Sequence, residues 1–125
     1  MDKKIKCLVV DDEKHFLLYL KILFEHNGYE VISSSSVDEA LHVVKEEEIE
    51  FIVSDIHMPV KDGFQFLSEL KNNNETKEIP VLIVSSDDGR DVVNRVMEMG
   101  AIGFMRKPVL QHHLKKVSEM IARQN

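Results

Sequence analysis

Apolar residues in the chain follow two alternating patterns: short apolar runs, and longer stretches in which apolar residues return every three or four positions. The runs, of which the second alternates only weakly, predict strands at Ile5–Val10, Tyr29–Ser33, Ile49–Ser54, Pro80–Val84 and Ala101–Met105. The stretches between and after them predict helices, marked by Phe16, Leu20, Leu23 and Phe24; Val37, Ala40, Leu41 and Val44; Phe64, Phe66, Leu67 and Leu70; Val92, Val93, Val96 and Met97; and Leu110, Leu114, Val117 and Ile121. Asn27-Gly28 and Gly100 are typical of helix ends.

Strict alternation of strands and helices predicts a parallel sheet that is covered by helices on both faces. Continuous apolar runs suit strands that are buried on both sides. The predicted fold class is therefore α/β, a five-stranded doubly wound parallel sheet with five helices, in a single domain over residues 1–125. The polar segment from Asn72 to Glu78 is expected to be a mobile connection.

Composition narrows the class of protein. Hydrophobic residues make up 43% and charged residues 30%, which is the balance of a globular domain rather than a disordered chain. One cysteine, Cys7, excludes a disulfide framework and favours a cytoplasmic protein. The apolar runs are too short to span a membrane, and no secretion signal is visible. A net charge of -6 argues against direct binding of nucleic acid.

Polar residues follow the predicted strands at their carboxyl ends. Asp11 and Asp12 follow the first, Asp55 the third, Ser85 the fourth and Lys107 the fifth. Parallel strands bring these ends to one edge of the sheet, where such folds bind ligands. Crowded carboxylates repel one another, and a hard cation such as Mg²⁺ relieves that repulsion. With a lysine and a hydroxyl added, the edge has the parts that hold a phosphoryl group, and a carboxylate can be the nucleophile.

Each of these residues also has a simpler interpretation. Asp11 or Asp12 would suit the N-cap of the first helix, and Ser85 that of the fourth. Asp55 would suit a turn, Lys107 a solvated surface, and the proline after it the first position of the last helix. Independent caps need not converge on one edge with complementary charges, so their combination favours a phosphoryl site.

Several short motifs lie at these strand ends. They are Val9–Glu13, Ser54–Pro59 with Gly63, Val84–Ser86, and Gly100-Ala101 leading to Phe104 and Lys107-Pro108. In this order and at these places they resemble the CheY-like receiver domain of two-component response regulators, over essentially the whole chain. The resemblance implies the flavodoxin-like sheet order 2-1-3-4-5. It also implies that the bond between Lys107 and Pro108 is cis.

The same resemblance implies roles for the site residues. Asp55 is expected to be the phospho-acceptor in a magnesium-dependent reaction. Asp12, Asp55 and the backbone carbonyl of His57 are expected to bind Mg²⁺ directly, and Asp11 through water. Lys107 is expected to pair with Asp55 at rest and with the phosphoryl oxygens afterwards.

Ser85 and Phe104 are the expected switch residues. Ser85 would hydrogen-bond the phosphoryl group, and Phe104 would rotate into the space behind it. His57 and Asp87, each two residues beyond a site residue, should overlook the entrance to the site. We hypothesise that they tune hydrolysis of the acyl phosphate by placing or blocking the attacking water, although both would also suit solvated loops.

The resemblance implies a signalling switch rather than an enzyme, because the chain would promote only its own phosphorylation and dephosphorylation. The phosphoryl donor would be the phosphohistidine of a sensor histidine kinase or phosphotransfer protein. A downstream protein would bind the face of the fourth helix, fifth strand and last helix, which carries Arg90, Asp91, Arg95, Arg106, Lys115 and Lys116. We expect neither direct binding to nucleic acid nor association with a membrane.

Two other classes fit the same sheet. A Mg²⁺-dependent phosphotransferase or phosphatase of the haloacid dehalogenase type would need Asp-x-Asp after the first strand and a cap insertion, and neither is present. A constitutive docking module would be expected to have lost Asp55, Ser85 or Lys107, and all three are present. With no effector domain after the last helix, the chain is expected to be a stand-alone receiver or a domain of a longer regulator or hybrid kinase.

Overall fold

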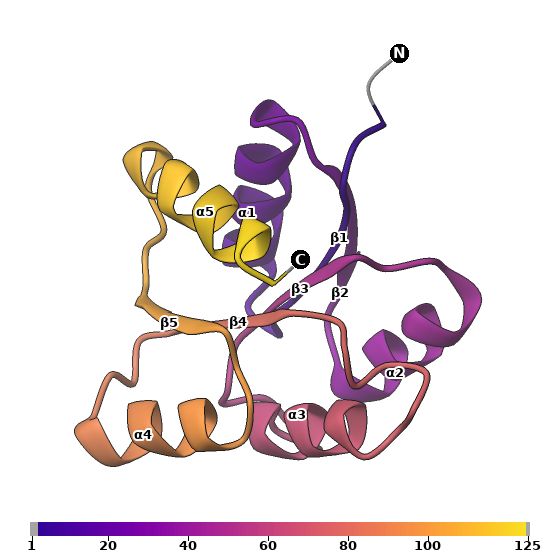
Figure 1. Ribbon diagram of the computed structural model, residues 1–125. Coiled ribbons are helices and arrows are strands. Elements are labelled where there is room, and N and C mark those ends of the chain that lie inside the picture. Colours follow the sequence, from indigo (N-terminus) through magenta and orange to yellow (C-terminus); the bar gives the residue numbers. More distant parts are fainter. Residues whose placement is uncertain (1–2, 125) are drawn as a thin grey trace.

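The computed structural model describes residues 3–124 and contains one sheet of five parallel strands (Figure 1). The order across the sheet is β2-β1-β3-β4-β5, which confirms the predicted order. The strands are β1 (Lys6–Val10), β2 (Glu30–Ser34), β3 (Phe51–Ser54), β4 (Val81–Ser85) and β5 (Gly103–Arg106). The predicted runs located all five strands, and no end differs by more than two residues.

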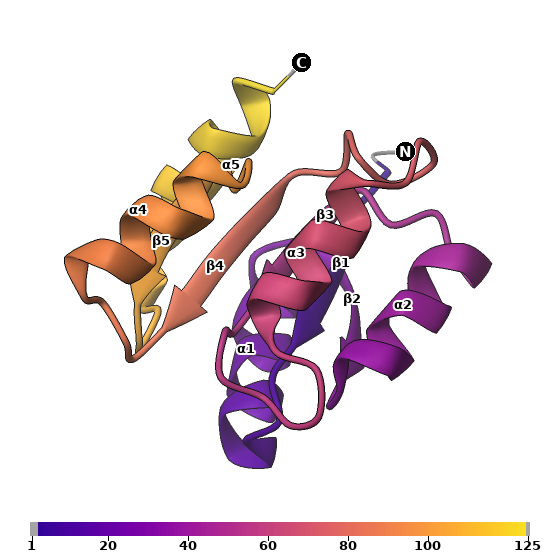
Figure 2. The same ribbon diagram turned by 90° about the horizontal axis from the view of Figure 1, so that it is seen from below.

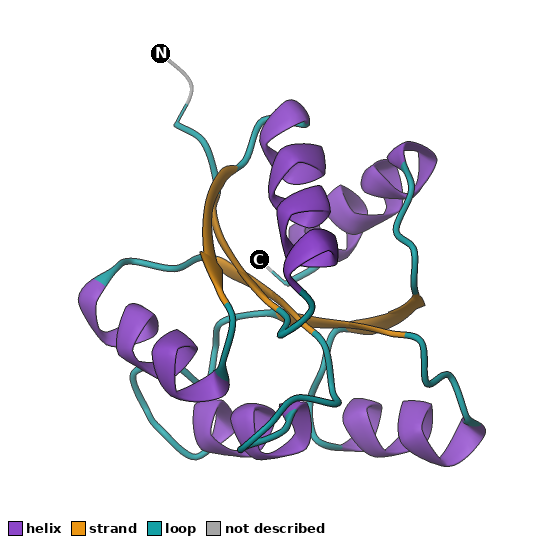
Figure 3. Cartoon of the chain, turned by 180° about the vertical axis from the view of Figure 1, so that it is seen from behind, coloured by secondary structure: helices purple, strands orange, loops and turns teal. Residues whose placement is uncertain are grey.

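Five α-helices cover both faces of the sheet, as predicted. They are α1 (Lys14–His26), α2 (Val37–Glu46), α3 (Gly63–Lys71), α4 (Arg90–Glu98) and α5 (Leu114–Ala122). Helices α1 and α5 lie on one face, and α2, α3 and α4 lie on the other (Figures 1 and 3). A short 3₁₀ turn, η1 (Gln111–His113), precedes α5, so the last apolar stretch is not one continuous α-helix.

The sheet separates two apolar cores. Leu8, Ile52 and Ile83 point to the face under α2, α3 and α4, where Phe66 is buried. Val9, Val53 and Val84 point to the face under α1 and α5, where Phe24 and Phe51 pack together. Neighbouring residues of one strand thus enter different cores, which explains why β1, β3 and β4 are apolar at consecutive positions.

Two glycines end helices in the manner that the sequence predicts. Gly28 follows α1 with φ +92, and Gly100 follows α4 with φ +103. L-residues rarely adopt this left-handed conformation, whereas glycine does so without a steric penalty. Both chain reversals return the backbone to the sheet for the strand that follows.

The strand register brings the carboxyl ends together. Val10 lies opposite Ser54, Ser54 opposite Ile83, and Ser85 opposite Arg106. Because all strands run in one direction, the residues that follow β1, β3, β4 and β5 meet at one edge (Figure 2). Within residues 3–124, no helix combines the length and the apolar character needed to cross a membrane.

Candidate functional site

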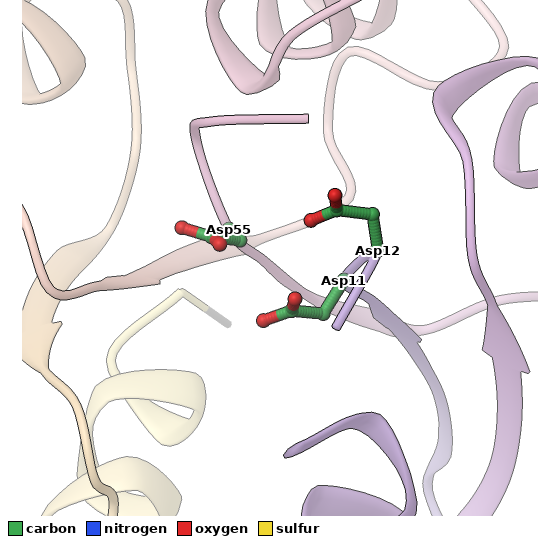
Figure 4. Close-up of side chains that lie close together, drawn as sticks. All are labelled: Asp11, Asp12 and Asp55. Carbon is green, nitrogen blue, oxygen red and sulfur yellow. The ribbon is translucent and has the colours of Figure 1, made fainter. Parts of the chain in front are cut away.

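Three aspartates from two strand ends form the centre of this edge. One carboxylate oxygen from each of Asp11, Asp12 and Asp55 lies within 4.8 Å of the others (Figure 4). Asp11 and Asp55 are buried, whereas Asp12 is exposed. The sequence predicted that these residues converge, and the structure brings all three together.

Asp55 is held in place from both sides of its carboxylate. One oxygen, Oδ1, accepts a hydrogen bond from the backbone N–H of Ile56 at 2.7 Å. The other, Oδ2, accepts from the Lys107 ammonium at 3.0 Å. The Asp55 backbone N–H donates to the Val10 carbonyl at 3.0 Å, which ties the end of β3 to the end of β1. The carboxylate is therefore fixed in orientation rather than free to rotate.

Lys107 bridges two of the aspartates. Its Nζ lies 2.7 Å from Asp11 Oδ2 and 3.0 Å from Asp55 Oδ2, and its side chain is 16% exposed. Burial would lower the pKa of Lys107, but the contacts with the Asp11 and Asp55 carboxylates outweigh that effect and raise the pKa. The lysine is therefore a permanent positive charge in the site.

Burial raises the pKa of Asp11, whereas by itself it would lower that of Lys107. The Asp11 side chain is 1% exposed, and burial raises its pKa, with the nearby Asp55 charge acting in the same direction. The contacts with Lys107 and the Glu13 backbone N–H, which donates to Asp11 Oδ1 at 2.9 Å, partly oppose the rise in pKa. Burial therefore disfavours the charged form of Asp11, and the neighbouring donors offset only part of that effect.

The simpler interpretation of the aspartates as helix caps is wrong. The N-cap of α1 is Glu13, whose carboxylate accepts from the N–H groups of His15 and Phe16. Ser85 does not cap α4 either, because the N-cap there is Gly89. Ser85 is buried, and its Oγ accepts from the Asp87 N–H at 3.1 Å. The hydroxyl hydrogen remains available to a ligand at the strand edge.

Lys107 and the following proline also depart from their simpler interpretations. Lys107 is paired and mostly buried rather than solvated. Pro108 lies before η1 and α5, so it is not the first residue of the last helix. The peptide bond between Lys107 and Pro108 is cis.

Gly63 allows α3 to begin directly against the backbone of Asp55 and Ile56. Its N–H donates to the Ile56 carbonyl at 2.6 Å. A side chain at this position would overlap the Asp55 carbonyl oxygen, and its Cβ would come within 2.7 Å of Ile56 Cα. The Asp62 carboxylate accepts from the Gln65 N–H and the Gln65 side-chain oxygen accepts from the Asp62 N–H, which makes a capping box at the start of the helix. Glycine is thus required here by close backbone approach.

His57 and Asp87 lie in two different loops and contact each other. His57 Nε2 lies 2.8 Å from Asp87 Oδ2, so the β3–α3 loop is joined to the β4–α4 loop. The hydrogen bond with His57 lowers the pKa of Asp87. The sequence placed both residues near the entrance but did not predict that they pair.

The remaining predicted residues lie around β5. Phe104 is half-buried and packs against the core under α4, opposite Ile83 of the neighbouring strand. Arg106 makes an ion pair with Asp88 at 3.7 Å. The Arg95 guanidinium lies over the Phe64 ring, 3.8 Å from its centroid, and is therefore turned toward α3.

The acidic cluster fits a hard divalent cation. Its donors are all carboxylate oxygens, which Mg²⁺ prefers. The crowded carboxylates repel one another, and a bound cation would relieve that repulsion. Lys107 offsets part of the negative charge, but three carboxylates and one ammonium leave the cluster negative.

Comparison with known proteins gives one consistent result. Residues 7–119 match the family model described as the response regulator receiver domain. The two-component response regulator-like PRR37 of Oryza sativa is 30% identical over 123 residues, which is 97% of this chain. The chain spans only 17% of that relative's length.

Two shorter relatives match along nearly their whole length. The probable chemotaxis protein CheY of Rhizobium etli is 29% identical over 120 residues, which covers 95% of this chain and 93% of that protein. The crystallised chemotaxis response regulator CheY4 of Vibrio cholerae superposes with a TM-score of 0.86 at 26% identity, over 95% of this chain and 99% of that one. The sequence likeness and the fold likeness thus cover the same residues.

Proposed function

The chain belongs to the response regulator receiver domain family, and on that premise we propose that it is a phosphorylation-controlled switch whose phospho-acceptor is Asp55. Receiver domains are signalling switches rather than conventional enzymes, and they interact with histidine kinases and downstream effectors. The donor proposed here is the phosphohistidine of a sensor histidine kinase or phosphotransfer protein.

One observation carries the proposal. Asp55 is a buried carboxylate that lies 3.0 Å from the Lys107 ammonium, and its oxygens are close to those of two further aspartates. A buried carboxylate needs a single cation for neutralisation, whereas this cluster gathers an excess of negative charge. Structural ion pairs do not require that excess, whereas a site that binds a metal cation does, and the cation and Lys107 can then neutralise a phosphoryl group.

In the proposed step, an Asp55 oxygen forms a bond to phosphorus as the bond from phosphorus to the donor imidazole nitrogen breaks. The imidazole nitrogen keeps the electron pair, and Asp55 becomes an acyl phosphate. Lys107, already next to Asp55, neutralises the phosphoryl oxygens. The Ser85 hydroxyl donates a hydrogen bond to one of them.

Mg²⁺ is the proposed cofactor, and it would neutralise charge on the phosphoryl oxygens. Asp12, Asp55 and the backbone carbonyl of His57 would hold it directly, and Asp11 would act through water. Because Asp11 is buried and already forms an ion pair with Lys107, we expect it to orient groups in the site rather than to bind the cation directly.

Ser85 and Phe104 are the proposed switch residues. Ser85 now accepts a hydrogen bond from the Asp87 N–H, and turning its hydroxyl toward a phosphoryl group would change the β4–α4 loop. Phe104 is half-buried in the neighbouring strand, so space vacated near Ser85 is within its reach. Phosphorylation would then shift an existing equilibrium between two arrangements of these residues.

The β5 side carries the proposed output surface. Arg90, Asp91, Arg106, Lys115 and Lys116 are exposed on α4, β5 and α5. Arg95 is turned toward α3, so we expect it to contribute least to binding. A downstream protein would distinguish the two states through this surface.

His57 and Asp87 are proposed to tune the lifetime of the acyl phosphate. They are partly exposed, and their contact spans the loops that flank the site. A side chain fixed at this entrance can block or orient the water that attacks the phosphoryl group.

The proposal is tested by incubation with acetyl phosphate and measurement of the intact mass, with and without Mg²⁺. We expect one phosphoryl group per chain, dependent on Mg²⁺ and removed by hydroxylamine. Asp12→Asn should need more Mg²⁺ for the same uptake. Folded protein that takes up no phosphoryl group from either acetyl phosphate or a phosphohistidine donor would favour a docking module. Rapid turnover of small phosphate esters would favour a phosphatase.

A further inference from the structure

The contacts of Lys107 include one partner that is not a carboxylate. Its Nζ lies over the ring of Phe16 in α1, 4.5 Å from the centroid. Asp11 and Asp55 bind the same ammonium at 2.7 and 3.0 Å. A cation over an aromatic face is attracted by the negative face of the ring, and more strongly when water is excluded, as it largely is here.

Phe16 is itself fixed by a neighbour on its helix. The rings of Phe16 and Tyr19 stack with their centroids 5.7 Å apart. The Tyr19 hydroxyl donates to the Val109 carbonyl, two residues after Lys107. Helix α1 therefore contacts the segment after β5 at two points, one through the lysine side chain and one through the backbone.

We propose that Phe16 is a positioning residue that holds the Lys107 ammonium at the phosphoryl site through the face of its ring, while Tyr19 fixes the segment that carries Lys107. The inference rests on the proposed function, because positioning matters only where Lys107 meets a phosphoryl group.

The ring differs from the carboxylates in a way that matters for the reaction. Asp55 loses its free carboxylate when it becomes an acyl phosphate, and Asp11 belongs to the cluster that would attract a cation. The contacts of Lys107 with both carboxylates are therefore expected to change during the reaction. The Phe16 ring is not altered, because a hard cation prefers oxygen and the ring takes no part in the transfer. The ring is the contact that persists while the others change.

The first test is structural and needs neither Mg²⁺ nor phosphate. In the NMR spectrum of the unphosphorylated protein, the ring current of Phe16 should move the Lys107 Cε methylene protons upfield. Phe16→Tyr keeps a ring face and should retain this shift. Phe16→Leu keeps apolar bulk without the ring and should lose it. Leu18→Ala, an exposed change on the same helix, is the matched control and should leave it unaltered.

The second test measures uptake of the phosphoryl group from acetyl phosphate. We expect Phe16→Leu to slow it by about threefold to thirtyfold, the range for a cation over a ring at partly to fully desolvated sites. Phe16→Tyr should restore the rate, and Leu18→Ala should not alter it. In a Lys107→Met background, Phe16→Leu should cause no further loss, since the ring then has no ammonium to hold.

An unchanged methylene shift in Phe16→Leu would overturn the proposal. So would an equal loss of rate from Phe16→Leu with and without Lys107, because the ring would then act by another route. Phe16→Met replaces Phe16→Leu in both tests if the latter is unfolded by circular dichroism. If the parent protein takes up no phosphoryl group from either acetyl phosphate or a phosphohistidine donor, the proposed function fails, and the methylene shift still decides whether the ring holds the lysine.

Discussion

Val9 and Asp11 lie two residues apart at the end of β1, and both are almost fully excluded from solvent. Val9 packs in the core under α1 and α5 among side chains such as Phe24 and Val53. Asp11 faces Asp55 and Lys107 at the carboxyl edge. Burial stabilises the valine by removing apolar surface from water, whereas it disfavours the charge of the aspartate. Equal burial therefore has opposite energetic consequences in the sheet interior and at its carboxyl edge.

This contrast indicates that the sheet interior and its carboxyl edge have different roles. The interior supplies the stability that lets the edge hold several charges close together. Charged groups crowded in a buried place are expected where a protein uses them for binding or chemistry. The following predictions test whether the two regions separate in this way.

The largest effect on stability is expected in the interior. Phe66 is fully buried under α3, and Phe66→Ala should lower the free energy of unfolding by about 3–5 kcal/mol, from lost burial and the cavity that remains. Urea denaturation measures this change. In the absence of urea, where most of the variant is folded, its uptake of phosphoryl groups should persist. A loss below about 1 kcal/mol would mean that the interior is not the source of stability assigned to it.

Gly63→Ala probes the border between the two regions and should affect both. The added methyl group would overlap the Asp55 carbonyl oxygen, so the start of α3 or the Asp55 loop must move. We expect a loss of about 1–3 kcal/mol in urea denaturation, together with slower phosphoryl uptake. Gly89→Ala is the control, since its nearest neighbour would be the Asp87 carboxylate at 3.4 Å, an ordinary contact. Loss of stability without any loss of uptake would show that Asp55 tolerates the shift.

Asp11→Asn should change stability in the opposite direction. In the absence of Mg²⁺ it should raise the free energy of unfolding by about 1 kcal/mol, as replacement of a buried charge often does. The amide can still accept from the Glu13 N–H, and Lys107 keeps Asp55 as its partner. A drop in stability would show that the pair with Lys107 outweighs the burial of the charge.

The pH dependence of this variant follows from the raised pKa of Asp11. A raised pKa means that the native state binds the proton more tightly than the unfolded chain does. The resulting stability is present below the unfolded pKa of about 4 and is lost as pH rises through the folded pKa. The advantage of Asp11→Asn should therefore be absent in acid and appear as pH rises. Urea denaturation as a function of pH measures it, and a difference independent of pH would contradict the assignment.

The smallest effect on stability is expected for the contact between His57 and Asp87. Both side chains are partly exposed, so removing either should change unfolding by less than about 0.5 kcal/mol. Their proposed effect is on the lifetime of the acyl phosphate. His57→Ala, Asp87→Ala and the double variant should give similar dephosphorylation rates, all different from the parent, because each breaks the same contact. Rates equal to the parent would remove the lifetime role, and additive changes would show that the residues act separately.

Much of the fold follows from local pattern. The apolar runs located the strands, Gly28 and Gly100 ended the helices as expected, and the order of polar residues at the strand ends placed the site. These features depend on neighbouring residues or on the common direction of parallel strands. They can therefore be predicted from the sequence without knowledge of side-chain positions.

The missed features depend on geometry that the pattern does not encode. Glu13, rather than an aspartate, caps α1, because Asp11 is turned toward Lys107. The contact between His57 and Asp87 joins positions 30 residues apart. The lysine over the Phe16 ring likewise joins α1 to the end of β5, and helical spacing assigned Phe16 only to packing.

The segment from Asn72 to Glu78 shows the same limit. It is polar throughout, yet it forms successive turns around the buried Thr76, which its composition does not predict. The Thr76 hydroxyl donates to the Leu70 carbonyl at 2.7 Å. In sequence, a polar residue that is buried to hydrogen-bond a carbonyl at a helix end looks like a solvated one. The structure shows the difference because it shows the hydrogen-bond partner.

The measurement that most directly tests the edge as a phosphoryl site is the location of the label. After phosphorylation with acetyl phosphate and Mg²⁺, borohydride reduction converts an aspartyl phosphate to homoserine, and peptide mass spectrometry identifies its position. We expect homoserine at position 55 alone, and no product in Asp55→Asn. Homoserine at Asp11 or Asp12, or a stable phosphate on Ser85, would contradict the assignment of Asp55 as the phospho-acceptor.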